Sequence, residues 1–250
     1  MASTGYGAIE TRIVEYKGHN GDTVSGFLAR PADGKPHPGV IVISEIFGLV
    51  NHVRELAFKF AGNGYVALAP DLFHREGPGM PEEIAAKVRE QGGVPDARAI
   101  GDLEGTAAYL KRMRSCTGKL GVIGYCSGGR QVVLFACNTK SLSAAVTCYG
   151  GRVVMAADQL TPRMPKAPID MIPNLSCPLL CLSGAEDQNP SPAMVEQLRQ
   201  ALEQNHKTFE VKSYEGAGHA FFADYRPSYR QAAAVDGWQR VFAWYGKHLA

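Results

Sequence analysis

The amino-acid sequence predicts an α/β protein with one mostly parallel sheet of eight strands, an N-terminal antiparallel hairpin and helices on both faces. Two observations indicate this class. Short runs rich in valine, isoleucine and leucine alternate along the chain with longer amphipathic stretches. These runs lack polar alternation, which is typical of strands buried on both faces. We expect residues 1–250 to form a single domain, large enough to need neither disulfides nor metals for stability.

The first two strands are expected within residues 11–31, where two alternating runs meet across Asn20-Gly21, a dipeptide typical of tight hairpin turns. The remaining strands are expected at 39–44, 65–70, 119–124, 143–150, 178–184 and 207–214. Helical spacing of apolar residues predicts helices around 49–60 and 103–110, over 191–205 after a Ser-Pro start signal, and over 227–249. The irregular segment 150–177, which contains four prolines, is expected to be a long loop that covers one end of the sheet.

Charge and hydropathy argue against several classes of function. The net charge is +2 and no block of like charges occurs, so we expect binding neither to nucleic acid nor to a membrane surface. The N-terminus lacks the basic start and apolar core of a signal peptide. No apolar stretch approaches the ~20 residues that cross a bilayer. A cytoplasmic protein is therefore expected.

Six cysteines are scattered through the chain, and none of them forms a C-x-x-C pair. Five are interpreted as reduced, buried residues because most cysteines here lie in apolar runs. A zinc site at Cys177 and Cys181 is an alternative, but these two residues bracket a predicted strand and no paired histidines lie nearby. We expect no metal and no organic cofactor.

The sixth cysteine, Cys126, is at the centre of the segment Gly124-Tyr125-Cys126-Ser127-Gly128, between a predicted strand and a predicted helix. The pattern G-x-S-x-G in this context marks a nucleophile elbow, a strained turn in which small residues on both sides of the nucleophile avoid clashes. Here cysteine replaces the serine. A helix starting near Ser127 would direct its positive end at the thiol. The alternative is a small buried cysteine between structural glycines, but the strand–turn–helix context favours a nucleophile.

A cysteine nucleophile needs a base and an acid that orients the base. In the elbow-containing fold these follow the nucleophile in the order acid, histidine. Asp187 and His219 each come just after a predicted strand, at the edge where open parallel sheets bind ligands. Glu186 is a rival for the acid, and a turn or capping residue is the alternative role for Asp187. The other histidines precede the elbow or lie at a helix end or the C-terminus.

An oxyanion hole requires two backbone N–H groups, one from the residue after the nucleophile and one from the loop after the third strand. Ser127 and Ile46 are the candidates. Glu45, directly before Ile46, places a carboxylate at the end of a buried strand. The alternative is that Glu45 is an ordinary loop acid exposed to solvent.

Six segments together resemble the dienelactone hydrolase family, the carboxymethylenebutenolidases: SEIFG (44–48), APDLF (69–73), GDLEGTAAYL (101–110), GVIGYCSGG (121–129), GAEDQNPSP (184–192) and GAGHAFF (216–222). The resemblance covers about residues 10–245. It implies an α/β-hydrolase fold with a triad of Cys126, His219 and Asp187. It also implies that Glu45 contacts the thiol and takes part in activating it, and that an enol-lactone is hydrolysed without a metal or organic cofactor.

Well-known members of this family bind the substrate carboxylate with two arginines, one of them four residues after the catalytic histidine. That position is Ala223 here. Arg75, Arg89 and Arg226 are the candidates to replace it. Candidate substrate contacts next to the motif residues are Phe47, Tyr125 and Phe221.

The thiol itself restricts the substrate class. An ordinary thiol has a pKa of about 8.5, far below that of an alkyl alcohol, so a thiolate leaves a tetrahedral intermediate more readily than an alkoxide does. The expected substrate is therefore a small-molecule activated ester or lactone. One alternative is a broad-specificity carboxylesterase or thioesterase on the same triad. The other is a non-catalytic binding or redox-sensing protein with Cys126 as the sensitive thiol. The protein is expected to be a monomer or a homodimer.

Overall fold

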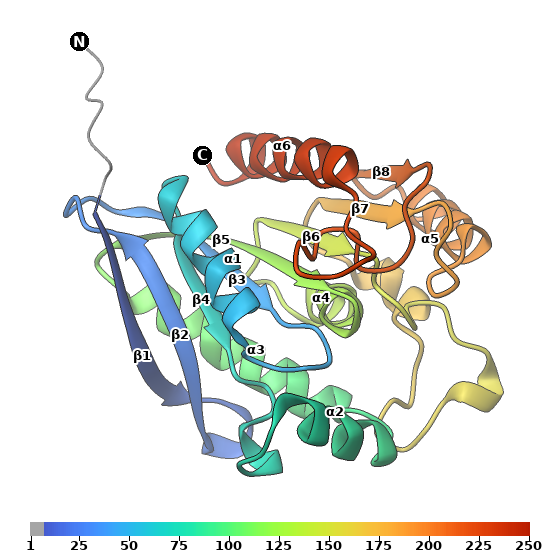
Figure 1. Ribbon diagram of the computed structural model, residues 1–250, viewed down its shortest axis with the longest axis horizontal. Helices are drawn as coiled ribbons and strands as arrows, with labels where there is room; N and C mark the ends of the chain where they lie inside the picture. Colours follow the sequence, from blue (N-terminus) through green and yellow to red (C-terminus); the bar gives the residue numbers. More distant parts are fainter. Residues whose placement is uncertain (1–7) are drawn as a thin grey trace.

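Eight strands form one sheet in the order β1-β2-β4-β3-β5-β6-β7-β8 in the computed structural model, which describes residues 8–250 (Figure 1). Strand β2 is antiparallel to both of its neighbours, and every other adjacent pair is parallel. The strands are Ile9–Lys17 (β1), Thr23–Pro31 (β2), His37–Ile43 (β3), Val66–Pro70 (β4), Cys116–Tyr125 (β5), Ala144–Cys148 (β6), Leu179–Gly184 (β7) and Phe209–Tyr214 (β8). The predicted mostly parallel sheet with an N-terminal antiparallel hairpin is confirmed.

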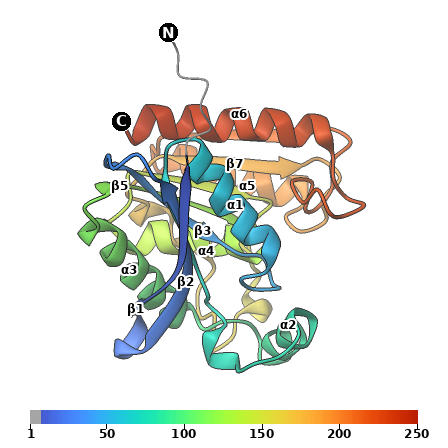
Figure 2. The same cartoon turned by 60° about the vertical axis from the view of Figure 1, so that its left-hand side comes forward.

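Helices cover both faces of this sheet (Figure 2). They are Asn51–Gly62 (α1), Pro81–Glu90 (α2), Asp96–Arg112 (α3), Ser127–Asn138 (α4), Pro192–Gln204 (α5) and Gln231–His248 (α6). The apolar sides of α1 and α6 pack on one face, where the rings of Phe60 and Tyr245 lie 6.0 Å apart. Helices α3, α4 and α5 pack on the other face. Within residues 8–250, no helix combines the length and the apolar character needed to cross a bilayer.

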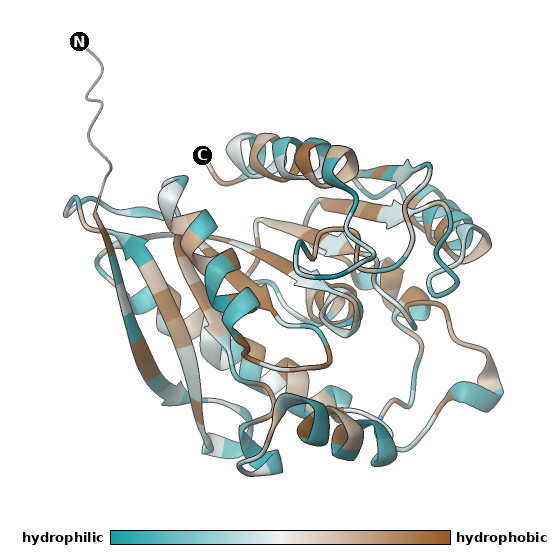
Figure 3. Cartoon of the chain, in the orientation of Figure 1, coloured by the Kyte–Doolittle hydropathy of each residue, from teal (hydrophilic) through white to brown (hydrophobic). Residues whose placement is uncertain are grey.

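The central strands are apolar because both of their faces are covered. In β3, Val40 and Val42 contact the α1–α6 layer, whereas Ile41 and Ile43 contact the opposite layer, and all four are fully buried. Successive strand residues point to opposite faces, so a strand covered on both sides needs apolar residues at every position. The colouring in Figure 3 shows hydrophobic residues concentrated along these inner strands. Burial on both faces, which the sequence predicted, therefore explains the unbroken apolar runs.

Several boundaries differ from those expected. The hairpin closes through five residues, Gly18 to Asp22, instead of a tight turn, and both Asn20 and Gly21 have positive φ there. The last helix begins at Gln231 instead of 227, because the backbone N–H of Arg230 donates a hydrogen bond to the carbonyl of Phe221 and holds the preceding segment in a loop. Helix α2 was not expected at all. Segment 150–177 is irregular as predicted, with short 3-10 turns at Ala157–Gln159 and Pro168–Asn174.

Candidate active site

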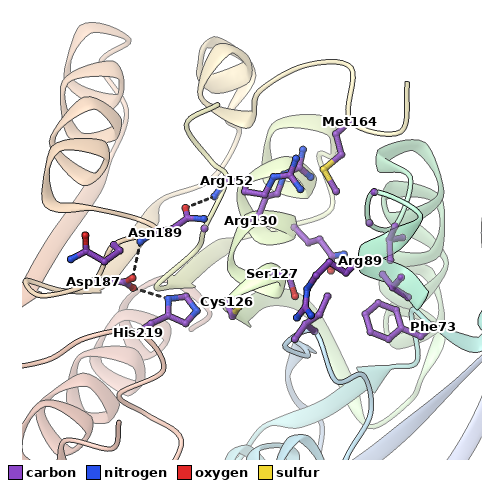
Figure 4. A pocket seen from close by; sticks show the side chains of 18 residues that line it. Phe73, Arg89, Cys126, Ser127, Arg130, Arg152, Met164, Asp187, Asn189 and His219 are labelled. Atoms are coloured by element: carbon purple, nitrogen blue, oxygen red, sulfur yellow. Dashed lines mark hydrogen bonds and ion pairs between the residues drawn. The ribbon is translucent and has the colours of Figure 1, made fainter. Parts of the chain in front are cut away.

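The segments that follow strands β3 to β8 meet at the carboxyl-terminal edge of the sheet and line a cavity of about 480 Å³ (Figure 4). Each strand is followed by a lining residue: Ile46 after β3, Phe73 after β4, Cys126 after β5, Arg152 after β6, Asp187 after β7 and His219 after β8. Helix α2 adds Val88 and Arg89 to the wall. Open parallel sheets bind ligands at this edge, because the loops after their strands converge there.

Cys126 is held in a strained turn between the last residue of β5 and the first residue of α4, with φ 56° and ψ −117°. This left-handed conformation is unfavourable for a residue other than glycine. The backbone around it is tightly packed: a Cβ on Gly128 would lie 2.5 Å from the carbonyl oxygen of Ser44, and a Cβ on Gly129 would lie 2.7 Å from Cα of Gly150. Only glycine fits at these two positions, so the backbone has the features of a nucleophile elbow.

His219 and Asp187 form a hydrogen-bonded pair beside Cys126. Nδ1 of His219 donates to Oδ2 of Asp187 at 2.8 Å, since a carboxylate can only accept. The other carboxylate oxygen, Oδ1, accepts a hydrogen bond from the backbone N–H of Asn189 at 2.9 Å. Asp187 is buried, whereas the neighbouring Glu186 is exposed. The structure thus brings Asp187, and not the rival Glu186, to the histidine.

The surroundings of His219 favour its protonated form. Burial of the ring opposes the positive charge, but the hydrogen bonds and charges of Asp187 and Cys126 outweigh it and raise the pKa of His219 to about 10. The ring of Tyr149 packs edge-on against the imidazole, with centroids 5.2 Å apart, and restricts its orientation. A cationic imidazolium next to Cys126 stabilises negative charge on the sulfur.

Two backbone N–H groups are available to a ligand at the same place. Ile46 and Ser127 both line the cavity beside Cys126. Within residues 8–250, neither of their amides donates a hydrogen bond to a backbone carbonyl. Ser127 is also the first residue of α4, so the positive end of this helix faces the cavity. Both amides are therefore available to donate to a ligand, as the oxyanion hole predicted from the sequence would require.

Glu45 is buried and pairs with Arg226 instead of lying free in a loop. Nη2 of Arg226 is 2.5 Å from Oε2 of Glu45, whose side chain is 7% exposed. The other oxygen, Oε1, is buried and has no partner among the described residues. The guanidinium of Arg226 lies 5.2 Å from the centre of the Phe47 ring. Arg226 and Phe47 face a second, separate cavity of about 690 Å³ that does not include Cys126.

The other candidate substrate contacts are distributed unevenly. Arg89 lines the cavity of Cys126. Arg75 does not, because it forms ion pairs at 2.7 Å with Asp22 and with the buried Asp102. Tyr125 and Phe221 are buried in the core against the α1–α6 layer. Tyr125 is the last residue of β5 and its side chain lies in the α1–α6 layer, whereas Cys126 is in the turn that follows, so adjacency in sequence did not place the tyrosine ring in the cavity.

Sequence reasoning missed several residues of the cavity wall. Arg152 and Asn189 come from the loops after β6 and β7, Arg130 comes from α4, and Met164 comes from the irregular segment. Arg130 is neutralised by two hydrogen bonds to Asp96, at 2.6 and 3.1 Å. The position of Arg152 just after a parallel strand was a usable signal, since such loops face the site. No group of His, Cys, Asp or Glu side chains in the described part of the chain is placed to hold a metal ion.

Comparison with known proteins relates the chain to one family. The profile of the Dienelactone hydrolase family matches residues 24–249. A protein of Escherichia coli (strain K12), provisionally assigned as a carboxymethylenebutenolidase, is 38% identical over 235 residues, which cover 91% of this chain and 84% of the relative. A solved structure from Klebsiella pneumoniae, provisionally described as a dienelactone hydrolase, shares 37% identity with a TM-score of 0.86 and covers 96% of this chain and 99% of that chain. A Bradyrhizobium protein, likewise provisionally named a 2-oxo-3-(5-oxofuran-2-ylidene)propanoate lactonase, is 29% identical over 236 residues, 93% of this chain and 92% of the relative.

Proposed function

The chain belongs to the dienelactone hydrolase family and is a hydrolase of ester or lactone bonds, and on this premise we propose that it cleaves an activated ester or enol-lactone with a triad of Cys126, His219 and Asp187. The observation that carries the proposal is the convergence of three features on one cavity. They are a cysteine in a strained elbow, a histidine held by a buried carboxylate, and two free backbone amides.

The proposed reaction follows from these positions. Cys126 gives its thiol proton to His219, its sulfur attacks the carbonyl carbon, and the amides of Ile46 and Ser127 stabilise the negative oxygen that forms. The carbon–oxygen bond to the leaving group breaks, and the leaving oxygen takes a proton from His219, which leaves an acyl-thioester on Cys126. A water molecule then gives a proton to His219 and attacks the thioester. The carbon–sulfur bond breaks, the acid is released, and the sulfur takes the proton back from His219.

Glu45 is proposed as a second group that accepts the thiol proton. Its Oε1 atom is buried without a partner, whereas Oε2 is held by Arg226. A carboxylate with a free oxygen is able to accept a hydrogen bond or a proton there. This role was implied by the family resemblance. The burial and the unpartnered oxygen support it.

The leaving group is the basis for choosing between ester classes. A thiolate is expelled from the tetrahedral intermediate in strong preference to an alkoxide, but this preference is far smaller against an enolate or a phenolate, whose conjugate acids are much more acidic than an alkyl alcohol, and it is absent against another thiolate. The name of the Bradyrhizobium relative describes a lactone whose ring oxygen is bonded to an alkylidene carbon, so ring opening releases an enolate. Release of an enolate in this way would also suit attack by the thiol of Cys126.

A panel of substrates with one acyl group tests this proposal. Purified protein would be given phenyl butyrate, ethyl butyrate and a butyryl thioester, with α-angelica lactone as an enol-lactone. We expect the aryl ester, the thioester and the enol-lactone to be cleaved, and the ethyl ester to react at least about a hundredfold more slowly. Equal rates on ethyl and phenyl esters would favour a general carboxylesterase and contradict the proposal.

Variants separate the enzyme from a redox-sensing protein. Cys126→Ala is expected to abolish turnover, whereas Cys148→Ala, which changes a buried cysteine in the next strand, is the matched control and keeps it. Rapid acid quenching followed by mass spectrometry should detect a butyryl group on Cys126 alone. Hydrolysis that survives Cys126→Ala would refute the nucleophile, and the absence of any hydrolysis by the wild-type protein would favour the sensor.

A further inference from the structure

Strand β1 forms one edge of the sheet and has a neighbour on one side only. It pairs with β2 and comes first in the strand order. In the views of Figure 1 and Figure 2, no helix or strand of residues 8–250 lies beyond it, while α1 and α3 lie on the two faces of the sheet. The outer side of an edge strand presents N–H and C=O groups that are able to pair with a further strand.

The backbone groups that point outward belong to the odd-numbered residues of β1. At one end of the hairpin, the N–H of Ala32 donates to the carbonyl of Ala8 at 2.9 Å. At the other end, the N–H of Gly18 donates to the carbonyl of Asp22 at 2.8 Å. Hydrogen-bonded pairs alternate with non-hydrogen-bonded pairs along an antiparallel ladder, and the β1–β2 register runs without interruption, so the even-numbered residues direct their backbone groups to β2. The outward groups are those of Ile9, Thr11, Ile13, Glu15 and Lys17.

One face of this edge carries an exposed apolar residue. Ile13 lies opposite Phe27 of β2, and the ring of Phe27 is 5.8 Å from that of Phe58 of α1. Ile13 is 59% exposed and Phe58 is 41% exposed, although both are large and apolar. Exposed apolar residues that cluster on one surface are typical of a contact with another molecule.

The other face of the same edge carries opposite charges. Glu10 forms an ion pair of 2.5 Å with Arg30 of β2, and the side chain of Glu10 is still 57% exposed. Arg12 lies on the same face, two residues along the strand, and is exposed. Within residues 8–250, Arg12 forms no ion pair. The edge therefore offers a carboxylate that is able to accept a second cation, and a cation that has no acid.

A second copy of β1 complements this edge in the antiparallel register that is centred on Thr11. Thr11 then lies opposite Thr11 of the second copy, and Ile9 lies opposite Ile13. Both kinds of pair consist of odd-numbered residues, so their outward N–H and C=O groups form hydrogen bonds. Glu10 lies opposite Arg12 in a pair without backbone hydrogen bonds, where side chains are closest and opposite charges attract.

Neighbouring registers lack this complementarity. A two-fold axis at Glu10 or at Arg12 would place the same charge opposite itself, which destabilises a cross-strand pair. An axis at Ile13 would place the apolar Ile9 opposite the charged Lys17. Among the registers centred on residues 10–13, only the one at Thr11 therefore pairs opposite charges on one face and apolar residues on the other.

We propose that the protein forms a symmetric homodimer through antiparallel pairing of β1 with β1 of a second copy, in the register centred on Thr11. The two sheets then join into one continuous sheet. No residue that lines the cavity of Cys126 comes from β1, so the pairing leaves both cavities accessible. This interaction surface is additional to the proposed hydrolase activity and does not depend on it.

Sedimentation equilibrium measures the dimer directly. A single pair of strands buries less than the roughly 1,600 Å² of a standard interface, so we expect a reversible dimer with a dissociation constant in the micromolar range. Arg12→Glu and Glu10→Arg each place like charges opposite one another at both charged pairs and should weaken the dimer about 10- to 100-fold. Glu210→Lys changes an exposed acid on β8, the strand at the other edge, and is the matched control that should leave the dimer unchanged. A wild-type protein that stays monomeric at about 200 µM overturns the proposal, as does a dimer that neither β1 variant weakens.

A mixture of the two charge variants separates specific pairing from a general effect of charge. In a mixed dimer, Glu10 of the Arg12→Glu chain faces Arg12 of the Glu10→Arg chain, and the two substituted residues face each other with opposite charges. The mixture should therefore dimerise within about threefold of wild type, although each variant alone pairs poorly. Thermal unfolding of each variant checks that its fold is intact. Folded variants that stay monomeric when mixed overturn the pairing.

A cysteine cross-link tests the register without a change of charge. Thr11→Cys, in a Cys126→Ala background in which the five remaining native cysteines are buried, should form a disulfide-linked dimer under mild oxidation. The Cα atoms of a hydrogen-bonded antiparallel pair are about 5.5 Å apart, within the range of a disulfide. Ile13→Cys in the same background is the control, because position 13 and its copy would be about 13 Å apart along the strands. A cross-link from Ile13→Cys, or the absence of one from Thr11→Cys, overturns the proposed register.

Discussion

Replacement of Asp187 by asparagine tests the acid of the proposed triad with almost no change in shape. Oδ1 of Asp187 accepts a hydrogen bond from the backbone N–H of Asn189, and Oδ2 accepts one from Nδ1 of His219. Because the Asn189 amide can only donate, it would hold the carbonyl oxygen of the new side chain at the Oδ1 position. The new NH₂ group would then face Nδ1 of His219. The imidazole must then carry its proton on the other nitrogen, which can no longer accept a proton from Cys126.

The expected loss follows from two contributions. The bond of 2.8 Å between His219 and Asp187 is charge-assisted, and its loss is worth about 1.5–3 kcal/mol, or about 10- to 150-fold in rate. The wrong tautomer adds to this, and in a serine triad the same substitution lowers kcat about 10⁴-fold. We therefore expect kcat of Asp187→Asn to fall by between about 10² and 10⁴. The pKa of His219 should also fall, since Asp187 contributes to raising it.

The assay is hydrolysis of 4-nitrophenyl acetate by wild type, Asp187→Asn and Glu186→Gln across a pH series, with thermal unfolding as a check on folding. Glu186→Gln is a matched control, because it removes the exposed carboxylate next to Asp187 in the chain. It should stay within about twofold of wild type, as expected for a surface change. The reasoning would be refuted by an Asp187→Asn variant within about threefold of wild type, or by equal losses in the two variants.

Two further predictions concern stability. Arg226→Gln leaves the buried carboxylate of Glu45 without its cation, so the free energy of unfolding in urea should fall by about 3 kcal/mol. The double variant Arg226→Gln/Glu45→Gln should recover most of this loss, because the uncompensated charge is then removed as well. Independent, additive losses in the two single variants would contradict the pairing. The pKa of His219 is raised from 6.5 to about 10 in the folded protein, so the stabilisation by Asp187 is fully present below pH 6.5 and is lost as the pH rises toward 10. The difference in unfolding free energy between wild type and Asp187→Asn should shrink over this range, and a constant difference would show that the pair does not titrate as described.

The features predicted from sequence are those that local geometry imposes. A strand covered on both faces has to be apolar throughout, as in β3. A nucleophile elbow requires small residues near Cys126, and Gly128 has no space for a Cβ. The order of Cys126, Asp187 and His219 follows from the order of the strands that precede them. These requirements appear as short patterns in the chain, and so the sheet and the positions of Asp187 and His219 could be predicted.

The features that were missed depend on packing between distant segments. The partner of Glu45 is Arg226, 181 positions away in the chain, and no local pattern indicates that pairing. Arg75 was a candidate ligand of the substrate, but it is held by a buried Asp102 from another helix. Helix α2 is a different case, because its sequence carries a visible start signal, with Pro81 in the first turn and acidic residues after it. That signal was sufficient to predict the helix, though not its position over the cavity.

The connection between β8 and α6, residues 215–230, carries both His219 and Arg226. The histidine faces the sulfur, and the arginine neutralises the carboxylate of Glu45 at the end of a different strand. This arrangement couples the length of one loop to two separate contacts. An insertion or deletion between positions 219 and 226 would move Arg226 away from Glu45 while His219 stays beside Asp187, and a buried carboxylate would be left without its cation. The seven-residue step from the histidine to the arginine therefore acts as a spacer between the two acids.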